Sequence, residues 1–217
     1  MIGIVDYNAG NIKSVERALS YIGTPYVLSK NPKDLQKVDK VIFPGVGEAK
    51  YAMEQLHETG FYSFLKDFAK SGKPLLGICL GSQIIFDHSE EGDVDCLGIV
   101  PGIIQHFSTV FEKQGKDMAT YKGLKIPHMG WNNLEFHKES SLFQEVEKEA
   151  SFYFVHSYMI QPQDNSIVVA SADYGVLVPS VITWKNISAC QFHPEKSAKA
   201  GLQILRNFVQ NQDGKLC

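Results

Sequence analysis

The chain has 217 residues, of which 44% are hydrophobic and 21% are charged, and its formal net charge at pH 7 is −3. Because this length and composition suit one globular unit, we expect residues 1–217 to form a single domain. The small negative charge and the lack of a dense Lys/Arg run disfavour a nucleic acid or an anionic membrane surface as partner. No apolar run approaches the about 18 residues of a membrane-spanning helix.

The N-terminal sequence and the cysteines indicate a reducing compartment. The chain starts Met-Ile-Gly-Ile-Val-Asp, without the basic start and long apolar core of a signal peptide. The four cysteines, Cys79, Cys96, Cys190 and Cys217, are widely spaced and never form a C-x-x-C pair. We therefore expect a cytoplasmic protein with reduced thiols, no structural zinc or other metal, and no cofactor.

The first 85 residues alternate between short apolar strands and amphipathic helices. We expect strands at residues 2–5, 26–29, 41–43 and 73–79, and helices at 12–22, 49–56, 61–68 and after residue 79. This alternation predicts an α/β fold with an open, doubly wound, mostly parallel sheet and helices on both faces. In such sheets, sites form beyond the carboxyl ends of the strands. The candidate loops are residues 6–11, 44–47 and the turn after residue 79.

The second half of the chain has a different pattern. Short β-like runs occur at residues 97–100, 103–107, 152–158, 167–171 and 181–187, with a polar connection at 112–123. A final helix is expected from residue 198 to residue 209, with an apolar stripe along one face. This pattern predicts a small antiparallel addition to the same domain.

A G-x-nucleophile-x-G pattern follows the apolar run at residues 73–79. Gly77 and Gly81 flank Cys79 at the spacing that a sharp strand-to-helix turn requires, because Cβ atoms beside such a turn would clash. The N-terminus of the next helix would favour a thiolate at Cys79. On these residues alone, a buried core cysteine between two incidental glycines is an equally good interpretation.

A cysteine nucleophile needs a histidine that takes its proton and a carboxylate that orients the histidine. Among the seven histidines, His193 has Glu195 two positions later, so both side chains would share one face of an extended segment. His128 and His156 lie in promising segments, but neither has a carboxylate at strand spacing. We therefore predict His193 and Glu195 as the partners of Cys79.

The glycine-rich segment at residues 44–47 is the candidate oxyanion hole. Its glycines would let the backbone N–H groups of Val46 and Gly47 turn towards the neighbouring strand end, and the N–H of Leu80 would supply a further donor. Because glycine makes a peptide flip cheap, we expect this segment to switch when a partner binds.

Together, the segments Gly77-Ile-Cys-Leu-Gly-Ser-Gln83 and Gln191-Phe-His-Pro-Glu195 resemble the two signatures of class I (triad) glutamine amidotransferases. Within this family the chain is most similar to the glutaminase subunits of imidazole glycerol phosphate synthases. That similarity spans nearly the whole chain. Its evidence is Asp6-Tyr7-x-x-Gly10-Asn11 and the segments at residues 44–47, 127–132, 153–158 and 195–197.

The resemblance implies a reaction and a set of roles. Cys79 would attack the side-chain amide of glutamine, His193 would shuttle the proton, and Glu195 would orient His193. Ammonia would leave, and water would hydrolyse the thioester to glutamate. The positions that correspond to the family's glutamine-binding residues are Gly45, Gly47, Gln83, Glu91, Ser157 and Tyr158.

The resemblance also implies a partner. Asn11 and Lys196 lie where the family docks a (β/α)8-barrel cyclase subunit, which takes up the ammonia to make imidazole glycerol phosphate and a purine intermediate. The chain departs from the family pattern at residues 8–9 and 48–49 and at Ser82, and none of these changes removes a catalytic group. A second kind of partner stays open: paralogous subunits supply ammonia to enzymes that amidate surface-glycan sugars.

Three other functions fit less well. A stand-alone α/β-hydrolase-like cysteine enzyme would place its carboxylate before the histidine, whereas Glu195 follows His193. A zinc deaminase needs a later Pro-Cys-x-x-Cys, but the only later cysteine is Cys217. A non-catalytic regulatory member of the fold would be expected to lack one of the three catalytic residues.

Overall fold

The structure is a computed structural model that describes residues 1–116 and 124–211. Cys217 and most of the polar connection expected at 112–123 lie outside the described residues. Its largest element is an eight-stranded sheet. In spatial order its strands are β2 (Tyr26–Ser29), β1 (Ile2–Val5), β3 (Lys40–Gly45), β4 (Leu75–Cys79), β14 (Ile187–Cys190), β13 (Leu177–Trp184), β12 (Val168–Asp173) and β9 (Glu135–Phe136).

The strands from β2 to β14 are parallel, and the strands from β13 to β9 are antiparallel. Two smaller sheets lie beside the main one, and both have antiparallel pairs. One is a two-stranded ribbon of β8 (His128–Asn133) and β10 (Ser151–His156), called the β8–β10 ribbon below. The other has the order β11 (Tyr158–Pro162), β7 (Gly102–His106), β5 (His88–Ser89) and β6 (Val94–Asp95).

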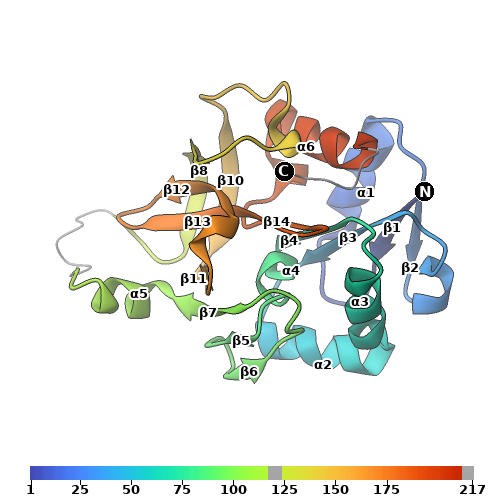
Figure 1. Ribbon diagram of the computed structural model, residues 1–217, viewed down its shortest axis with the longest axis horizontal. Coiled ribbons are helices and arrows are strands. Elements are labelled where there is room, and N and C mark those ends of the chain that lie inside the picture. The colour runs from blue at the N-terminus through green and yellow to red at the C-terminus, as the bar shows by residue number, and fades with distance from the viewer. Residues whose placement is uncertain (117–123, 212–217) are drawn as a thin grey trace.

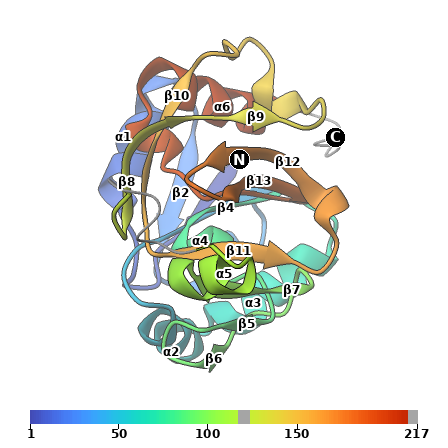
Figure 2. The same cartoon turned by 90° about the vertical axis from the view of Figure 1, so that its left-hand side faces the viewer.

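Helices cover both faces of the main sheet. In Figures 1 and 2, α1 (Ile12–Tyr21) and α6 (Ala198–Gln210) lie on one side, and α2 (Ala49–Thr59) and α3 (Phe61–Lys70) lie on the other. The single-turn helix α4 (Leu80–Gln83) follows β4, and α5 (Phe107–Lys113) follows β7. The 3-10 turns are η1 (Pro32–Leu35), η3 (Ser141–Phe143), η4 (Asn165–Ile167) and η5 (Pro194–Lys196). This arrangement confirms the predicted doubly wound α/β fold.

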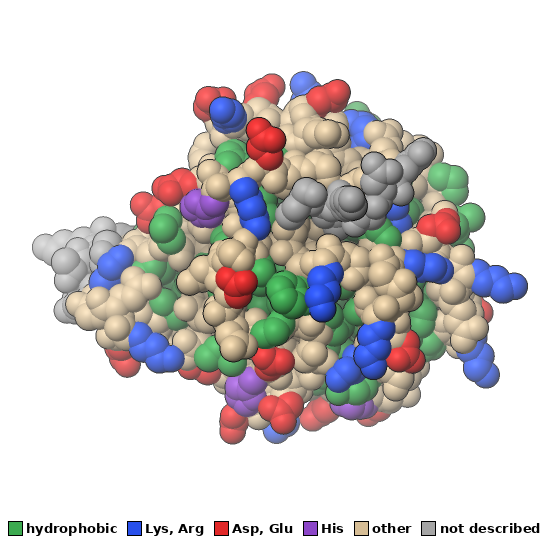
Figure 3. Space-filling view, in the orientation of Figure 1, with side chains coloured by type: hydrophobic (Ala, Val, Ile, Leu, Met, Phe, Trp, Pro, Cys, Tyr) green, Lys and Arg blue, Asp and Glu red, His purple; other side chains and the backbone are tan. Residues whose placement is uncertain are grey.

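The continuous apolar runs of the parallel strands reflect burial on both faces. Ile4 and Ile42 face the core formed with α1 and α6, whereas Val5 and Phe43 face the core formed with α2 and α3. Side chains of a strand alternate between faces, so one short strand supplies both cores. Within the described residues, no helix combines the length and apolarity needed to cross a membrane. The face in Figure 3 carries acidic and basic side chains intermixed.

Two expectations for the second half were wrong. Residues 97–100 form a loop and not a strand, because their backbone N–H groups bond to carbonyls just after α4: Leu97 N to Ile84 O at 3.0 Å, and Ile99 N to Ile85 O at 2.9 Å. The run expected at 181–187 contains the turn between β13 and β14. Strand β8, which was not expected, pairs along its full length with β10.

Candidate active site

Cys79 is the last residue of β4, and its backbone has φ 54° and ψ −112°. A non-glycine residue at positive φ is strained, which is typical of a nucleophile elbow. The flanking glycines make the turn possible. A Cβ on Gly81 would lie 2.0 Å from the carbonyl oxygen of Phe43, and one on Gly77 would lie 2.8 Å from the carbonyl oxygen of Gly81. The glycines are therefore required by close backbone approach, as the sequence pattern predicts.

His193 follows β14, the parallel neighbour of β4, so both residues reach the same edge of the sheet. Its Nδ1 lies 2.7 Å from Oε1 of Glu195, and both side chains are buried. The other ring nitrogen, Nε2, has no hydrogen-bond partner among the described residues, and His193 lines the same cavity as Cys79. Burial alone would lower the pKa of His193, but the neighbouring Cys79 and the Glu195 carboxylate together raise that pKa to about 10.

The contact between His193 and Glu195 arises from a turn, and the strand spacing expected from the sequence was the wrong reason for it. Pro194 starts η5, whose tight turn brings Glu195 back onto the imidazole. Ser197 fixes this turn, because its hydroxyl donates to the carbonyl of His193 at 2.7 Å and accepts from the backbone N–H of Tyr153 at 2.9 Å. The pair is therefore rigidly connected to β10.

A cavity of about 210 Å³ contains the sulfur of Cys79 and the imidazole of His193. Nearly all of the residues predicted for oxyanion and glutamine binding line it. Glu195 and Gly45 lie behind this lining, and the predicted interface residues Asn11 and Lys196 lie outside it. The lining is Val46, Gly47, Cys79, Leu80, Gln83, Glu91, Val155, His156, Ser157, Tyr158 and His193.

The glycine-rich segment lies beside the nucleophile, as expected for an oxyanion hole. Gly45 pairs with Cys79 at the end of β3, and a Cβ on Gly45 would lie 2.6 Å from the backbone nitrogen of Gly81. Gly47 has φ 94° and open space around its Cα, so its backbone conformation, and not packing, requires glycine. Glycine at this position leaves the peptide free to rotate, and the predicted switch stays a prediction.

Gln83 and Glu91 are both partly committed to protein contacts. The amide nitrogen of Gln83 donates to the carbonyl of Tyr158 at 2.9 Å and to Oε1 of Gln191 at 2.9 Å. Its two N–H bonds are therefore used, which leaves its oxygen as the group available to a ligand. Glu91 accepts from the backbone N–H of Ala49 at 2.9 Å, and burial raises the pKa of its carboxyl group. Both residues thus offer acceptors, which suit an ammonium group better than a carboxylate.

Two residues of the cavity wall were not predicted as such: Val155 was not singled out, and His156 was considered only as a partner of Cys79. The carbonyl of Val155 lies 4.0 Å from the sulfur of Cys79. The exposure of Met129 and Trp131 was not predicted either. Their side chains are 60% and 55% exposed on the outer face of the β8–β10 ribbon. The segments at 127–132 and 153–158 were noted in the sequence, but their pairing could not be read from either one alone.

The predicted interface residues lie near each other. Asn11 precedes α1, where its side chain accepts from the hydroxyl of Ser14 at 3.1 Å. Lys196 is in η5, which contacts α1, and its exposed ammonium lies 5.9 Å from the ring centroid of Tyr153. Trp131 packs edge-on against the same ring, with centroids 6.1 Å apart. An exposed surface therefore runs from the start of α1 to the β8–β10 ribbon.

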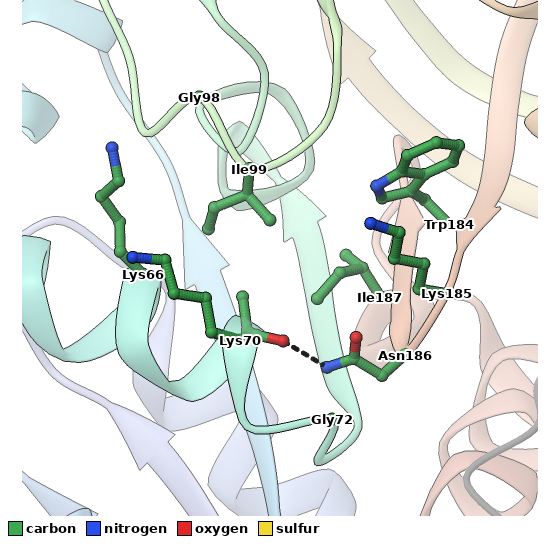
Figure 4. Close-up of a pocket in the computed structure, with 10 residues that line it drawn as sticks. Lys66, Lys70, Gly72, Gly98, Ile99, Trp184, Lys185, Asn186 and Ile187 are labelled. Atoms are coloured by element: carbon green, nitrogen blue, oxygen red, sulfur yellow. Dashed lines mark hydrogen bonds between the residues drawn. The ribbon is translucent and has the colours of Figure 1, made fainter.

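A second hollow, of about 600 Å³, lies at the amino ends of β4 and β14 (Figure 4). Asn186 donates across it to the carbonyl of Ala69 at 3.0 Å. In Figure 4 the ammonium groups of Lys66 and Lys70 extend to one side of the hollow and do not converge with that of Lys185. It shares no lining residue with the cavity at Cys79. Within residues 1–116 and 124–211, no group of three or more His, Cys, Asp or Glu residues could hold a metal ion.

Comparison with known proteins gives close relatives. The family described as glutamine amidotransferase class-I matches residues 3–212 of the chain. The imidazole glycerol phosphate synthase subunit HisH of Geobacillus kaustophilus is 45% identical over 216 residues, which are 99% of this chain and 99% of that protein. The subunit of the same name from Bacillus subtilis is 44% identical over 211 residues, 97% of this chain and 96% of that protein.

Solved structures share the fold at lower identity. The crystal structure of a glutamine amidotransferase has a TM-score of 0.71 and 16% identity, with 96% of each chain covered. The structure of PurLQS from Thermotoga maritima has a TM-score of 0.68 and 19% identity, again with 96% of each chain covered.

Proposed function

Since this chain belongs to the class I glutamine amidotransferase family, we propose that it is the glutaminase subunit of an imidazole glycerol phosphate synthase. The observation that carries the proposal is that Cys79, His193 and Glu195 lie together at one edge of the sheet. The chain that holds them is 45% identical to such a subunit over nearly its full length. We place the protein in the cytoplasm, because Cys79, Cys96 and Cys190 are free thiols, as is usual in a reducing compartment.

The first half of the reaction forms a thioester. His193 takes the thiol proton of Cys79 through Nε2, and the sulfur attacks the side-chain carbonyl carbon of glutamine, so a C–S bond forms and the carbonyl becomes an oxyanion. Backbone N–H groups of Val46, Gly47 and Leu80 stabilise this charge. As the C–N bond breaks, His193 gives a proton through Nε2 to the leaving nitrogen, and ammonia departs.

The second half restores the thiol. His193 now takes a proton from water, and the hydroxide equivalent attacks the γ-glutamyl thioester. The C–S bond breaks, glutamate leaves, and the proton returns to Cys79. Throughout, Glu195 holds the imidazole by its Nδ1–H and stabilises the positive charge that develops on the ring. Glu91 and the side-chain oxygen of Gln83 bind the α-ammonium of glutamine.

The partner is a (β/α)8-barrel cyclase subunit that receives the ammonia. Ammonia released into water would be diluted and protonated, so a sealed contact around the cavity is needed. The surface from Asn11 and Lys196 to Met129 and Trp131 adjoins β10, which also lines the cavity. Exposed Trp and Met are enriched at protein interfaces, so we assign the cyclase to this surface.

Glutamate release tests the proposal. It is measured for the chain alone, for the chain with the purified cyclase subunit, and for that complex with the cyclase's own substrate. We expect weak release alone, strong release in the ligand-bound complex, and none from Cys79→Ala. Cys96→Ala is the control and keeps its activity. Full release without the cyclase would refute a regulated subunit, and no release under any condition would indicate a non-catalytic member of the fold.

The same assay separates the two kinds of partner. A chain that serves histidine synthesis responds to the barrel cyclase. A chain that supplies surface-glycan amidation responds only to a sugar-amidating synthase, and that result would overturn the assignment.

A further inference from the structure

The β8–β10 ribbon carries two buried histidines that the proposed chemistry does not use. His128 and His156 face each other across the ribbon and are 2% and 7% exposed. His128 stacks on the rings of Phe154 and Tyr174, with centroids 4.5 Å and 4.0 Å away. The ring of Phe107 lies 5.3 Å from that of His156. Aromatic packing therefore holds both imidazoles in place.

Asn132 fixes the protonation of the first histidine. Its amide nitrogen donates to the carbonyl of Asp173 at 2.9 Å, and its amide oxygen accepts from the backbone N–H of Asn133 at 2.9 Å. A carbonyl can only accept and an N–H can only donate, so the orientation of the amide is settled. The same amide nitrogen lies 3.3 Å from Nε2 of His128. This Nε2 must accept, and the proton of His128 is on Nδ1.

The hydrogen bond that His156 makes to Tyr158 fixes the donor direction in the same way. Nδ1 of His156 lies 2.7 Å from the carbonyl oxygen of Tyr158, which can only accept, so His156 carries its proton on Nδ1. Its Nε2 then accepts from Nδ1 of His128, 3.0 Å away. The hydrogen bonds run from Asn132 through His128 and His156 to the Tyr158 carbonyl, and both rings are neutral.

The surroundings support the neutral state. Burial lowers the pKa of His128 to about 4. Burial, with smaller contributions from His128 and His193, lowers the pKa of His156 to about 3. A proton added to His156 would place two N–H groups face to face between the rings, so a charged ring would break the chain.

The hydrogen-bond chain ends on the wall of the cavity. The Tyr158 carbonyl that accepts from His156 also accepts from Gln83, and residues 156–158 line the cavity beside Glu91. We propose that Asn132, His128 and His156 are positioning residues, whose one-directional hydrogen bonds hold the wall at residues 157 and 158 in the geometry that binds glutamine. This inference rests on the proposed glutaminase activity for its substrate, but the hydrogen bonds themselves can be tested without substrate.

The first test determines which ring nitrogen carries the proton in His128 and in His156. Long-range ¹H–¹⁵N NMR of the full chain at about pH 7, without partner or glutamine, distinguishes Nδ1–H from Nε2–H imidazole. We expect Nδ1–H at both His128 and His156. An Nε2–H tautomer or a cationic ring at either position would overturn the inference. No substitution is needed, so a folding defect cannot obscure this result.

The second test replaces the hydrogen-bond donor at Asn132 by an acceptor. Asn132→Asp keeps the shape of the side chain but can no longer donate to His128 or, at any pH near neutrality, to the carbonyl of Asp173. Only a doubly protonated His128 can then bridge the new carboxylate and His156. We expect the KM for glutamine of the cyclase complex to be near the wild-type value at about pH 6 and to rise about tenfold by about pH 8.5, the effect of one lost hydrogen bond. The kcat changes less, because ground-state binding is what is lost.

Asn165→Asp is the matched control, because it makes the same chemical change at an exposed position of η4, outside the β8–β10 ribbon. Its KM should follow the wild-type pH profile. A purely structural role for Asn132 would lower the melting temperature of Asn132→Asp without a pH-dependent KM, and that result would overturn the inference. If the wild-type complex releases no glutamate, the proposed function fails, while the NMR test still decides the direction of the hydrogen bonds.

Discussion

Glu195→Gln isolates the contribution of one buried charge. The amide keeps the size of the carboxylate and an oxygen that can accept from Nδ1 of His193. In the wild-type protein this nitrogen lies 2.7 Å from Oε1 of Glu195. It loses the negative charge that helps to raise the pKa of His193 to about 10. A hydrogen bond to a charged group is worth about 1.5–3 kcal/mol. At 1.36 kcal/mol per pH unit, its loss should lower the pKa of His193 by about 1–2 units.

Both kcat and its pH dependence report this change. We expect kcat for glutamate release by the cyclase complex to fall about 10- to 100-fold at neutral pH, because the imidazolium of the transition state is less stabilised. The alkaline limit of activity should move to lower pH, since a lower pKa means that His193 loses its proton earlier. Glu147→Gln, at an exposed position, is the control. An unchanged kcat and alkaline limit would refute the role of Glu195.

Three further predictions follow from packing, exposure and burial. Gly81→Ala should destabilise the fold by about 3 kcal/mol, because its Cβ would lie 2.0 Å from the backbone oxygen of Phe43; urea unfolding at the wild-type midpoint would contradict this. Trp131→Ala should weaken cyclase binding about tenfold or more in calorimetry, while the fold is retained, because the side chain is 55% exposed; unchanged affinity would remove it from the interface. Stability should fall as pH drops from about 6.5 to about 4. In this pH range the histidines of the unfolded chain are protonated, whereas the buried rings of His128 and His156 stay neutral in the folded chain. The urea midpoint of His128→Gln should therefore drop less than that of the wild type, and equal drops would contradict the lowered pKa of His128.

The parallel half of the fold could be predicted because its determinants are local. β1, β3 and β4 are short apolar runs buried on both faces, β2 is a half-buried edge strand, and each of the four is followed by a turn or a helix. The elbow at Cys79 could be predicted for the same reason. Gly77 and Gly81 are needed by backbone approaches within a few residues of the nucleophile or across one strand pair.

The β8–β10 ribbon could not be predicted in this way. β8 reads His-Met-Gly-Trp-Asn-Asn, without the β-branched residues that mark a strand, and its stability comes from pairing with the distant β10. Neither His128 nor His156 has a carboxylate at strand spacing in the sequence. Their partners are each other, Asn132 and a backbone carbonyl. Contacts of this kind depend on the assembled fold and leave no spacing in the sequence.

The right pair was also found for an incomplete reason. His193 and Glu195 do meet, but η5 brings them together, and the turn depends on Pro194 and Ser197. The amide of Gln83 illustrates the same limit. The sequence placed Gln83 among the glutamine-binding positions, but it could not show that Tyr158 and Gln191 take both of its N–H groups and leave only its oxygen.

Labelling by an electrophilic glutamine analogue tests most directly whether Cys79 is the nucleophile. The two other described cysteines serve as internal controls, because burial raises the pKa of Cys96 to about 12 and also raises the pKa of Cys190. Peptide mass spectrometry of the inactivated cyclase complex should find one label per chain, on Cys79, and glutamine should protect against it. A label on Cys96 or Cys190, or inactivation with Cys79 unmodified, would contradict the account.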